Sequence, residues 1–143
     1  ITGLSSVADD TGLEVDALGG APGIFSARYA GESFNYEDNV KKLLSELSGI
    51  GTDRWTARFI TVAVYVDKET ELSAEGVVEG VITEKPEGFG GFGYDPVFSV
   101  LDMKKTYAEL SDEEKNRVSH RGKAIRSLIK KLRENGLIAD NPS

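Results

Sequence analysis

The sequence predicts a single α/β domain over residues 1–143, with an antiparallel hairpin and flanking helices. Three observations lead to this class. The length and a hydrophobic content of 39% suit one domain that buries a core. Two β-rich segments, ARFITVAVYV and LSAEGVVEGVI, stand on either side of DKET, as the strands of a hairpin do. Apolar residues recur at helical spacing near residues 36–47 and 120–132.

The first segment, SSVADDTGLEVDAL, has short apolar runs on both sides of its acidic residues. We interpret Asp9 and Asp10 as the end of a strand, with an acidic turn at Thr11 and Gly12. Adjacent side chains on a strand point to opposite faces, so at most one of the two carboxylates enters a given cleft. There it could bind Mg²⁺ or deprotonate water. The alternative is an ordinary acidic turn with no catalytic role.

A helix is predicted from about Tyr36 to Leu47, with Asn35 as its N-cap and Gly49 where it ends. Its apolar positions are Val40, Leu43, Leu44 and Leu47. The hairpin follows, and its second strand contains Gly76 and Gly80. Glycine inside a strand indicates a bulge or a close approach of another backbone.

Residues 89–96, FGGFGYDP, form a glycine loop that precedes a short predicted strand, YDPVFSV. A backbone without Cβ atoms can approach a flat ligand closely, and Phe92 and Tyr94 could stack on a base. Asp95, an acceptor when ionised, suits N–H groups on such a base. The alternative is a β-turn with a buried aromatic residue and an Asp that caps its own backbone.

Two helices are predicted near the C-terminus. Ser111 and Glu114 have capping-box spacing, and Ser119 is a second N-cap. The longer helix begins near His120 and ends before Gly136. The unpaired amides of its first turn, together with the side chains of His120, Arg121 and Lys123, predict an anion-binding site. A surface histidine on a capped helix is the alternative.

Composition excludes several classes of protein. Asp and Glu number 24 against 17 Lys and Arg, a net charge of −7, so no global basic field exists to hold a nucleic-acid polymer. With no cysteine, disulfides and thiolate metal sites are absent, as suits a reducing compartment. The longest apolar stretch, Phe59 to Val66, is interrupted by Thr61 and is too short to cross a bilayer. We therefore expect a cytoplasmic protein with no membrane partner.

Taken together, ADDTGLEVDALGGAPGIFSARYAGE, GGFGYDPVF and EEKNRVSHRGKA, in this order, resemble the inosine triphosphate pyrophosphatase family. The resemblance extends from Val7 to Leu132. It implies a mixed twisted sheet with flanking helices, and hydrolysis of the non-canonical purine nucleoside triphosphates ITP, dITP and XTP to a monophosphate and pyrophosphate. It also implies a small-molecule nucleotide as substrate, Mg²⁺ as cofactor, a cytoplasmic location and a homodimer.

The family's roles are carried over where residues match. The resemblance implies that Asp10 is the general base and helps to hold the metal, and that Arg121 and His120 recognise the carbonyl oxygen of the oxidised base. The full set of implied substrate contacts is Thr11, Phe92, Gly93, Tyr94, Asp95, Lys115, His120 and Arg121.

One family segment has no match here. Family members begin with a strand, a triphosphate-binding loop of the type Thr-x-Asn-x-x-Lys, and a helix that carries a metal-binding Glu. We therefore expect a chain without the N-terminal strand and helix, either incomplete at its N-terminus or a natural short form. The alternative function is an inactive nucleotide-binding or assembly module. The septum-inhibitor type of nucleotide pyrophosphatase matches these motifs less well.

Overall fold

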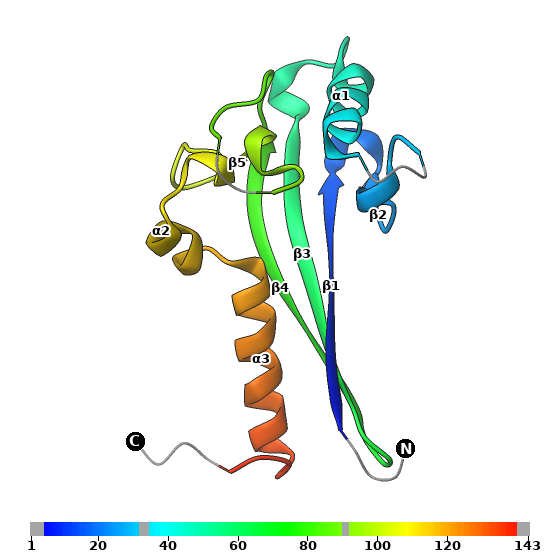
Figure 1. Ribbon diagram of the computed structural model, residues 1–143, viewed down its shortest axis with the longest axis vertical. Helices are drawn as coiled ribbons and strands as arrows, with labels where there is room; N and C mark the ends of the chain where they lie inside the picture. The colour runs from blue at the N-terminus through cyan, green and yellow to red at the C-terminus, as the bar shows by residue number, and fades with distance from the viewer. Residues whose placement is uncertain (1–4, 32–34, 90–91, 140–143) are drawn as a thin grey trace. The chain divides into compact units, whose positions relative to one another are not determined.

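The computed structural model describes residues 5–31, 35–89 and 92–139. Its strands and helices are β1 (Ser6–Val15), β2 (Pro22–Gly23), α1 (Tyr36–Leu47), β3 (Thr56–Val66), β4 (Glu71–Ile82), β5 (Phe98–Val100), α2 (Asp112–Arg117) and α3 (His120–Glu134) (Figure 1). Short 3₁₀ helices lie at Asp16–Leu18, Ser26–Arg28, Thr52–Arg54, Asp95–Val97 and Tyr107–Glu109. These elements confirm the α/β class. Within the described ranges, no helix combines the length and apolar character needed to cross a membrane.

The strands form one five-stranded sheet in the order β2-β1-β3-β4-β5. β1 and β2 are antiparallel, with Leu13 opposite Gly23, and β4 and β5 are antiparallel, with Val81 opposite Ser99. β3 and β4 are neighbours joined by a short loop, which confirms the predicted hairpin. In that loop the Asp67 carboxylate accepts hydrogen bonds from the backbone N–H of the residues two and three positions later, at 2.9 and 2.8 Å.

β1 is longer than the sequence predicts. The predicted strand end at Asp10 and turn at Thr11 and Gly12 are wrong, because the strand continues from Ser6 to Val15. β3 is the neighbour of β1 in the sheet, and β2 pairs with β1 at Leu13 and Glu14. Buried side chains follow the acidic residues at Leu13 and Val15. Sheet pairing therefore overrides the local turn preference of Asp, Thr and Gly.

β5 is shorter than predicted. The segment expected to form one strand is a 3₁₀ helix over Asp95–Val97, followed by a strand over Phe98–Val100. Pro96 lies in the first turn of that 3₁₀ helix. A proline has no N–H to donate to a neighbouring strand, and its fixed φ suits the start of a helical turn.

The chain divides into two compact units, and the second comprises residues 12–59 and 78–118. α1 has the predicted bounds, and the Asn35 side chain accepts a hydrogen bond from the Asp38 amide at 3.3 Å, as its capping role requires. The apolar side of α1 packs into a core that includes an aromatic cluster. That cluster consists of Phe59, Phe98 and Tyr107, with ring centroids 4.6 to 5.6 Å apart. Trp55 is also buried and donates to the Ile50 carbonyl at 3.0 Å.

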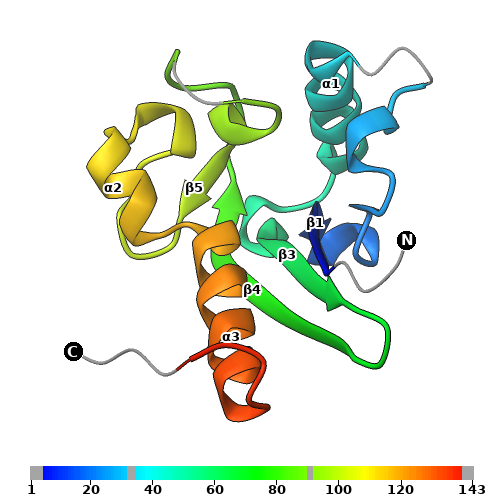
Figure 2. The same cartoon turned by 60° about the horizontal axis from the view of Figure 1, so that its bottom comes forward.

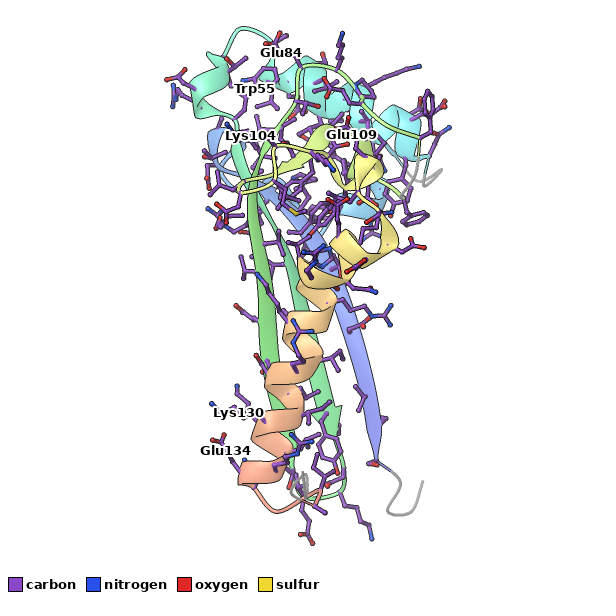
Figure 3. The ribbon with its side chains drawn as sticks, turned by 90° about the vertical axis from the view of Figure 1, so that its left-hand side faces the viewer. Trp55, Glu84, Lys104, Glu109, Lys130 and Glu134 are labelled. Atoms are coloured by element: carbon purple, nitrogen blue, oxygen red, sulfur yellow. The ribbon has the colours of Figure 1, made fainter. Side chains whose placement is uncertain are left out.

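The first unit comprises residues 5–11, 60–77 and 119–139 of the described chain, and α3 lies along the β3–β4 hairpin in it (Figure 2). Its core consists of Ala63, Ala74, Ala124, Leu128 and Leu132. Lys130 and Glu134 are exposed on α3 (Figure 3). A Cβ on Gly76 would lie 1.9 Å from the His120 carbonyl oxygen. The predicted close backbone approach at Gly76 is therefore confirmed, and it places the start of α3 directly on β4.

Candidate functional site

A chain of polar contacts joins β1, β3 and α3 within the first unit. The Thr11 and Thr61 hydroxyl oxygens are 2.8 Å apart, and the Thr61 hydroxyl lies 2.6 Å from Nδ1 of His120. Thr61 is fully buried, because alternate residues of β3 face the core. Two residues from separate sequence motifs, Thr11 and His120, are thereby linked through a third that no motif contains.

Arg121 contacts β1 through Asp9. Its Nε donates a hydrogen bond to Oδ2 of Asp9 at 2.5 Å, within an ion pair. Asp9 and Thr11 are two residues apart on β1, so their side chains share one face of the strand. The side chain of Asp10 points to the opposite face and is exposed. The structure thus brings Thr11, His120 and Arg121 together with Asp9, and it does not bring Asp10 to them.

The start of α3 is capped by Ser119, as the sequence predicts. The Ser119 hydroxyl accepts a hydrogen bond from the Gly122 amide at 2.9 Å, so the helix is capped. Lys123 donates from Nζ to the Val77 carbonyl at 3.1 Å. Burial lowers the pKa of His120 from 6.5 to about 4, and the nearby charge of Lys123 adds to this. The histidine is therefore neutral near pH 7.

Tyr94 is a core residue of the second unit. Only 3% of it is exposed, and its hydroxyl donates to the Ser26 carbonyl at 2.6 Å. Burial raises the pKa of its phenol. A ring this buried has no face open for stacking, so the sequence-based suggestion that Tyr94 stacks on a base is corrected. Tyr94 instead holds the glycine loop against the core.

Asp95 caps the backbone of its own loop, because its Oδ2 accepts a hydrogen bond from the Phe92 amide at 2.8 Å. This is the contact expected of Asp95 if the segment is a turn. Burial raises the pKa of this carboxyl group, while that hydrogen bond and the charge of Lys115 on α2 oppose the rise. Asp95 and Lys115 are thus electrostatic neighbours. The contacts around Asp95 favour the interpretation that it caps its own loop.

The loop has two aromatic residues that are available to a ligand, Phe89 and Phe92. Phe92 is 74% exposed, and its ring forms an edge-type contact with the ring of Tyr36, with the ring centroids 4.9 Å apart. Gly93 has a φ of 62° and packs against the same Tyr36 ring. Few residues other than glycine adopt this conformation at low cost. Gly90 and Gly91, which belong to the same motif, lie outside the described residues.

In the described ranges, no three His, Cys, Asp or Glu side chains gather closely enough to hold a metal ion. Mg²⁺ does not require such a cage, because it is commonly held by one or two carboxylates and the phosphates of its substrate. Asp10 has an exposed carboxylate, whereas Asp9 is committed to Arg121. Asp10 therefore fits a metal that arrives with a triphosphate.

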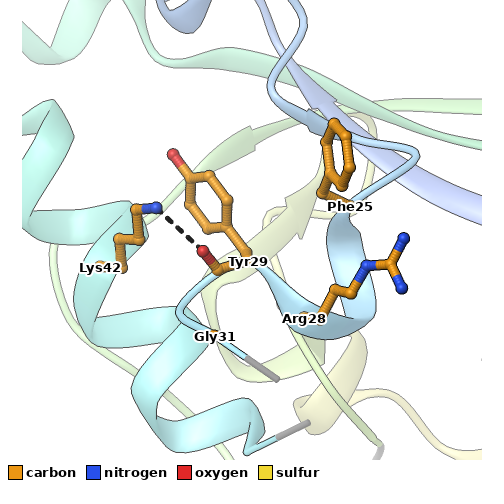
Figure 4. Close-up of a pocket in the computed structure, with 5 residues that line it drawn as sticks. All are labelled: Phe25, Arg28, Tyr29, Gly31 and Lys42. Carbon is orange, nitrogen blue, oxygen red and sulfur yellow. Dashed lines mark hydrogen bonds between the residues drawn. The ribbon is translucent and has the colours of Figure 1, made fainter. Parts of the chain in front are cut away.

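A separate hollow of about 470 Å³ lies in the second unit and is lined by Phe25, Arg28, Tyr29, Gly31 and Lys42 (Figure 4). The ammonium of Lys42 donates to the Tyr29 carbonyl at 2.9 Å and lies 4.4 Å from the centre of the Tyr29 ring. The guanidinium carbon of Arg28 lies 5.8 Å from the centre of the Phe25 ring. The two cationic side chains thus contact groups of the pocket wall. None of the residues predicted to bind substrate lines this hollow.

One site residue, Thr61, lies outside every motif. Asp9 lies inside the first motif, but its ion pair with Arg121 was not predicted. For Thr61 a signal existed, because it is the polar residue that interrupts an otherwise apolar strand. A buried hydroxyl requires a hydrogen-bond partner, so its position predicted a contact without identifying the partner. That partner lies 59 residues further along the chain.

Comparison with known proteins identifies the relatives of this chain. Residues 2–131 match the Ham1 family. The chain is 52% identical over 136 residues to a dITP/XTP pyrophosphatase of Shigella flexneri, covering 93% of this chain and 69% of that protein. It is 52% identical over 127 residues to the dITP/XTP pyrophosphatase of Bacillus subtilis (strain 168), covering 88% of this chain and 64% of that protein.

Solved structures agree with the sequence relatives. The structure of the Staphylococcus aureus Ham1 protein matches with a TM-score of 0.87 and 42% identity, covering 94% of this chain and 69% of that one. A nucleoside-triphosphatase, dITP/XTP pyrophosphatase, from Mycobacterium abscessus matches with a TM-score of 0.81 and 45% identity, covering 92% and 68%. The sequence and the fold point to the same relatives, and this chain therefore belongs to the Ham1 family.

Proposed function

We propose that this chain hydrolyses non-canonical purine nucleoside triphosphates such as ITP, dITP and XTP, releasing a nucleoside monophosphate and pyrophosphate. Relatives half identical to it carry the name dITP/XTP pyrophosphatase. The observation that carries the proposal is the meeting of β1 and α3, where Thr11, His120 and Arg121 gather. These residues come from motifs more than 100 positions apart, and folding makes them neighbours.

Base recognition follows from the donors in this cluster. An oxidised purine carries a carbonyl oxygen at its 6-position, which the guanidinium of Arg121 and an imidazole N–H of His120 can satisfy. Adenine presents an amino donor at the same place and leaves these donors unpaired. An unpaired buried donor costs about 1 to 3 kcal/mol, a discrimination of about ten- to a hundredfold per contact. Arg121 has an exposed side chain, so it can exchange Asp9 for a ligand.

Hydrolysis requires a base for the attacking water. We assign this role to Asp10, whose carboxylate accepts a proton as the water oxygen bonds to the α-phosphorus and the bond to the pyrophosphate oxygen breaks. Asp10 would also hold Mg²⁺ together with the triphosphate, and when bound the ion would neutralise phosphate charge and lower the pKa of the attacking water. Phe92 and Lys115 are assigned to contacts with the purine and the substrate, respectively.

A comparison of substrates and of two neighbouring variants tests the proposal. Pyrophosphate release is measured for dITP, XTP, dATP and dGTP with Mg²⁺, for the unaltered chain, Asp10→Asn and Asp9→Asn. We expect dITP and XTP to be preferred to dATP, and Asp10→Asn to lower kcat by about a hundredfold or more, as loss of a general base does. Asp9→Asn should leave kcat within about tenfold and change the preference between bases, because it releases Arg121.

The substrate class, the general base and the metal requirement can each be refuted separately. Equal hydrolysis of dATP and dITP would refute the substrate class, and an unchanged kcat in Asp10→Asn would refute the general base. A requirement for metal is tested by chelation with EDTA and by restoring Mg²⁺. Activity that survives chelation would exclude the metal.

We also propose that the protein is a cytoplasmic homodimer. Ile24 and Phe25 are adjacent and exposed, at 87% and 53%, and such residues favour burial against another chain. The absence of cysteine is compatible with a reducing compartment. Light scattering on the unaltered chain and on Ile24→Glu tests the assembly. A monomer in the first sample, or a dimer that survives in the second, would contradict an interface at this place.

A further inference from the structure

Thr61 has a hydroxyl group with a single proton and two polar neighbours. Thr11 Oγ1 lies 2.8 Å from it, and Nδ1 of His120 lies 2.6 Å from it. It is fully buried, so bulk water does not satisfy its hydroxyl. A single proton cannot be donated to both neighbours at once. The direction of one hydrogen bond therefore restricts the direction of the other.

The hydrogen bonds from Thr11 through Thr61 to His120 can run in either of two directions. In the first, Thr11 donates to Thr61, Thr61 donates to Nδ1, and the imidazole proton of neutral His120 lies on Nε2. In the second, Nδ1 carries the proton and donates to Thr61, which donates to Thr11. Because a neutral imidazole has one N–H, each direction of the chain goes with one tautomer of His120.

We propose that Thr61 is a positioning residue that donates to Nδ1 of His120 and so holds the histidine in the tautomer with its proton on Nε2. The proposal rests on the proposed function, because the carbonyl oxygen of an oxidised purine needs an N–H donor and Nε2 then supplies one. Thr61 lies on β3, whereas its two partners are on β1 and α3. It therefore also fixes the ring of His120 relative to the strand that carries Thr11.

His120 is the only histidine of the chain, so its tautomer can be measured without assignment of other residues. In the ¹⁵N-labelled protein near pH 7, long-range ¹H–¹⁵N correlation separates a protonated from an unprotonated ring nitrogen. We expect Nε2 to carry the proton and Nδ1 to be an acceptor in the unaltered chain. A proton on Nδ1 would overturn the proposal, and this measurement needs no variant that has to fold.

Two substitutions then test the role of the hydroxyl. Thr61→Val keeps the shape of the side chain and removes the hydroxyl, and Thr61→Ser keeps the hydroxyl. We expect Thr61→Val to shift the Nδ1 resonance and to mix the tautomers, and Thr61→Ser to restore the pattern of the unaltered chain. If Thr61→Val leaves both ring nitrogens unchanged, Thr61 does not position His120.

Kinetics supply the second measurement. In Thr61→Val the preference for dITP over dATP, measured as a ratio of kcat/KM values, should fall about tenfold, the effect of one lost hydrogen bond. Thr61→Ser should stay within about twofold of the unaltered chain. If the chain hydrolyses no dITP but its tautomer responds to Thr61→Val as expected, the proposed function fails and the positioning of His120 by Thr61 stands. An active chain with an unchanged preference in Thr61→Val would refute the specificity role.

Discussion

Gly76→Ala is the substitution that best tests how α3 is held. An added Cβ would lie 1.9 Å from the His120 carbonyl oxygen and 2.4 Å from the Ala124 amide nitrogen. Both atoms belong to the helix backbone, so neither can move away alone. Ordinary contact between such atoms is about 3.4 Å, and the start of α3 would therefore have to lift by about 1.5 Å.

That displacement sets the expected magnitude. Forcing extra volume into a packed site costs about 1 to 3 kcal/mol. The hydrogen bond between Thr61 and His120, 2.6 Å long in this structure, would stretch beyond bonding range and cost about 1 kcal/mol more. The free energy of unfolding should therefore fall by about 2 to 4 kcal/mol, which lowers Tm by about 10 °C for a chain of this size.

Thermal and urea unfolding measure the loss, and the ¹⁵N spectrum of the His120 ring reports the local shift. Glu75→Ala is the matched control, because Glu75 is the exposed neighbour of Gly76 on β4. Its unfolding free energy should stay within about 0.5 kcal/mol of the unaltered chain. If Gly76→Ala melts within about 2 °C of the unaltered chain, with the His120 spectrum unchanged, the close approach of α3 to β4 is refuted.

Three further predictions concern single side chains. The pKa of His120 is lowered on folding from 6.5 to about 4, so the unfolded chain binds a proton at a higher pH than the folded chain does. Roughly 2 to 3 kcal/mol of the free energy of unfolding should therefore be lost as the pH falls from 6.5 to 4. His120→Gln should remove this part of the pH dependence, and a folded-state His120 pKa near 6.5 would contradict the prediction. Tyr94→Phe removes the hydrogen bond to the Ser26 carbonyl and should cost about 1 to 2 kcal/mol in urea unfolding, whereas an unchanged midpoint would show that this bond does not hold the loop. Phe92→Ala should change stability by less than about 0.5 kcal/mol, because the ring is exposed, while KM for dITP rises; an unchanged KM would remove Phe92 from the substrate site.

The elements that could be predicted are those with local causes. α1 begins after Asn35 and covers Tyr36–Leu47 as expected, because the capping hydrogen bond and the apolar spacing lie within a few residues of each other. Ser119 caps α3 for the same reason. The family was also evident from the sequence, because its motifs are runs of neighbouring residues.

The elements that could not be predicted depend on distant partners. The acidic run in β1 has a strong local preference for a turn, yet the strand continues to Val15, with β3 as its neighbour in the sheet and β2 paired at Leu13 and Glu14. Tyr94 and Asp95 lie in a motif that suits a ligand, yet their own contacts hold the loop, and Phe92 is left exposed.

The sequence by itself determined the class of fold, the helix limits, the family and the residues in which chemistry is expected. The tertiary structure decided which of them meet. Thr61 is joined to His120 across 59 positions, and Arg121 to Asp9 across 112. Contacts at such separations depend on how strands pair and how a helix packs on them, and the packing of α3 depends on the missing side chain of Gly76. No local pattern encodes those distances, because they result from the burial of the whole first unit.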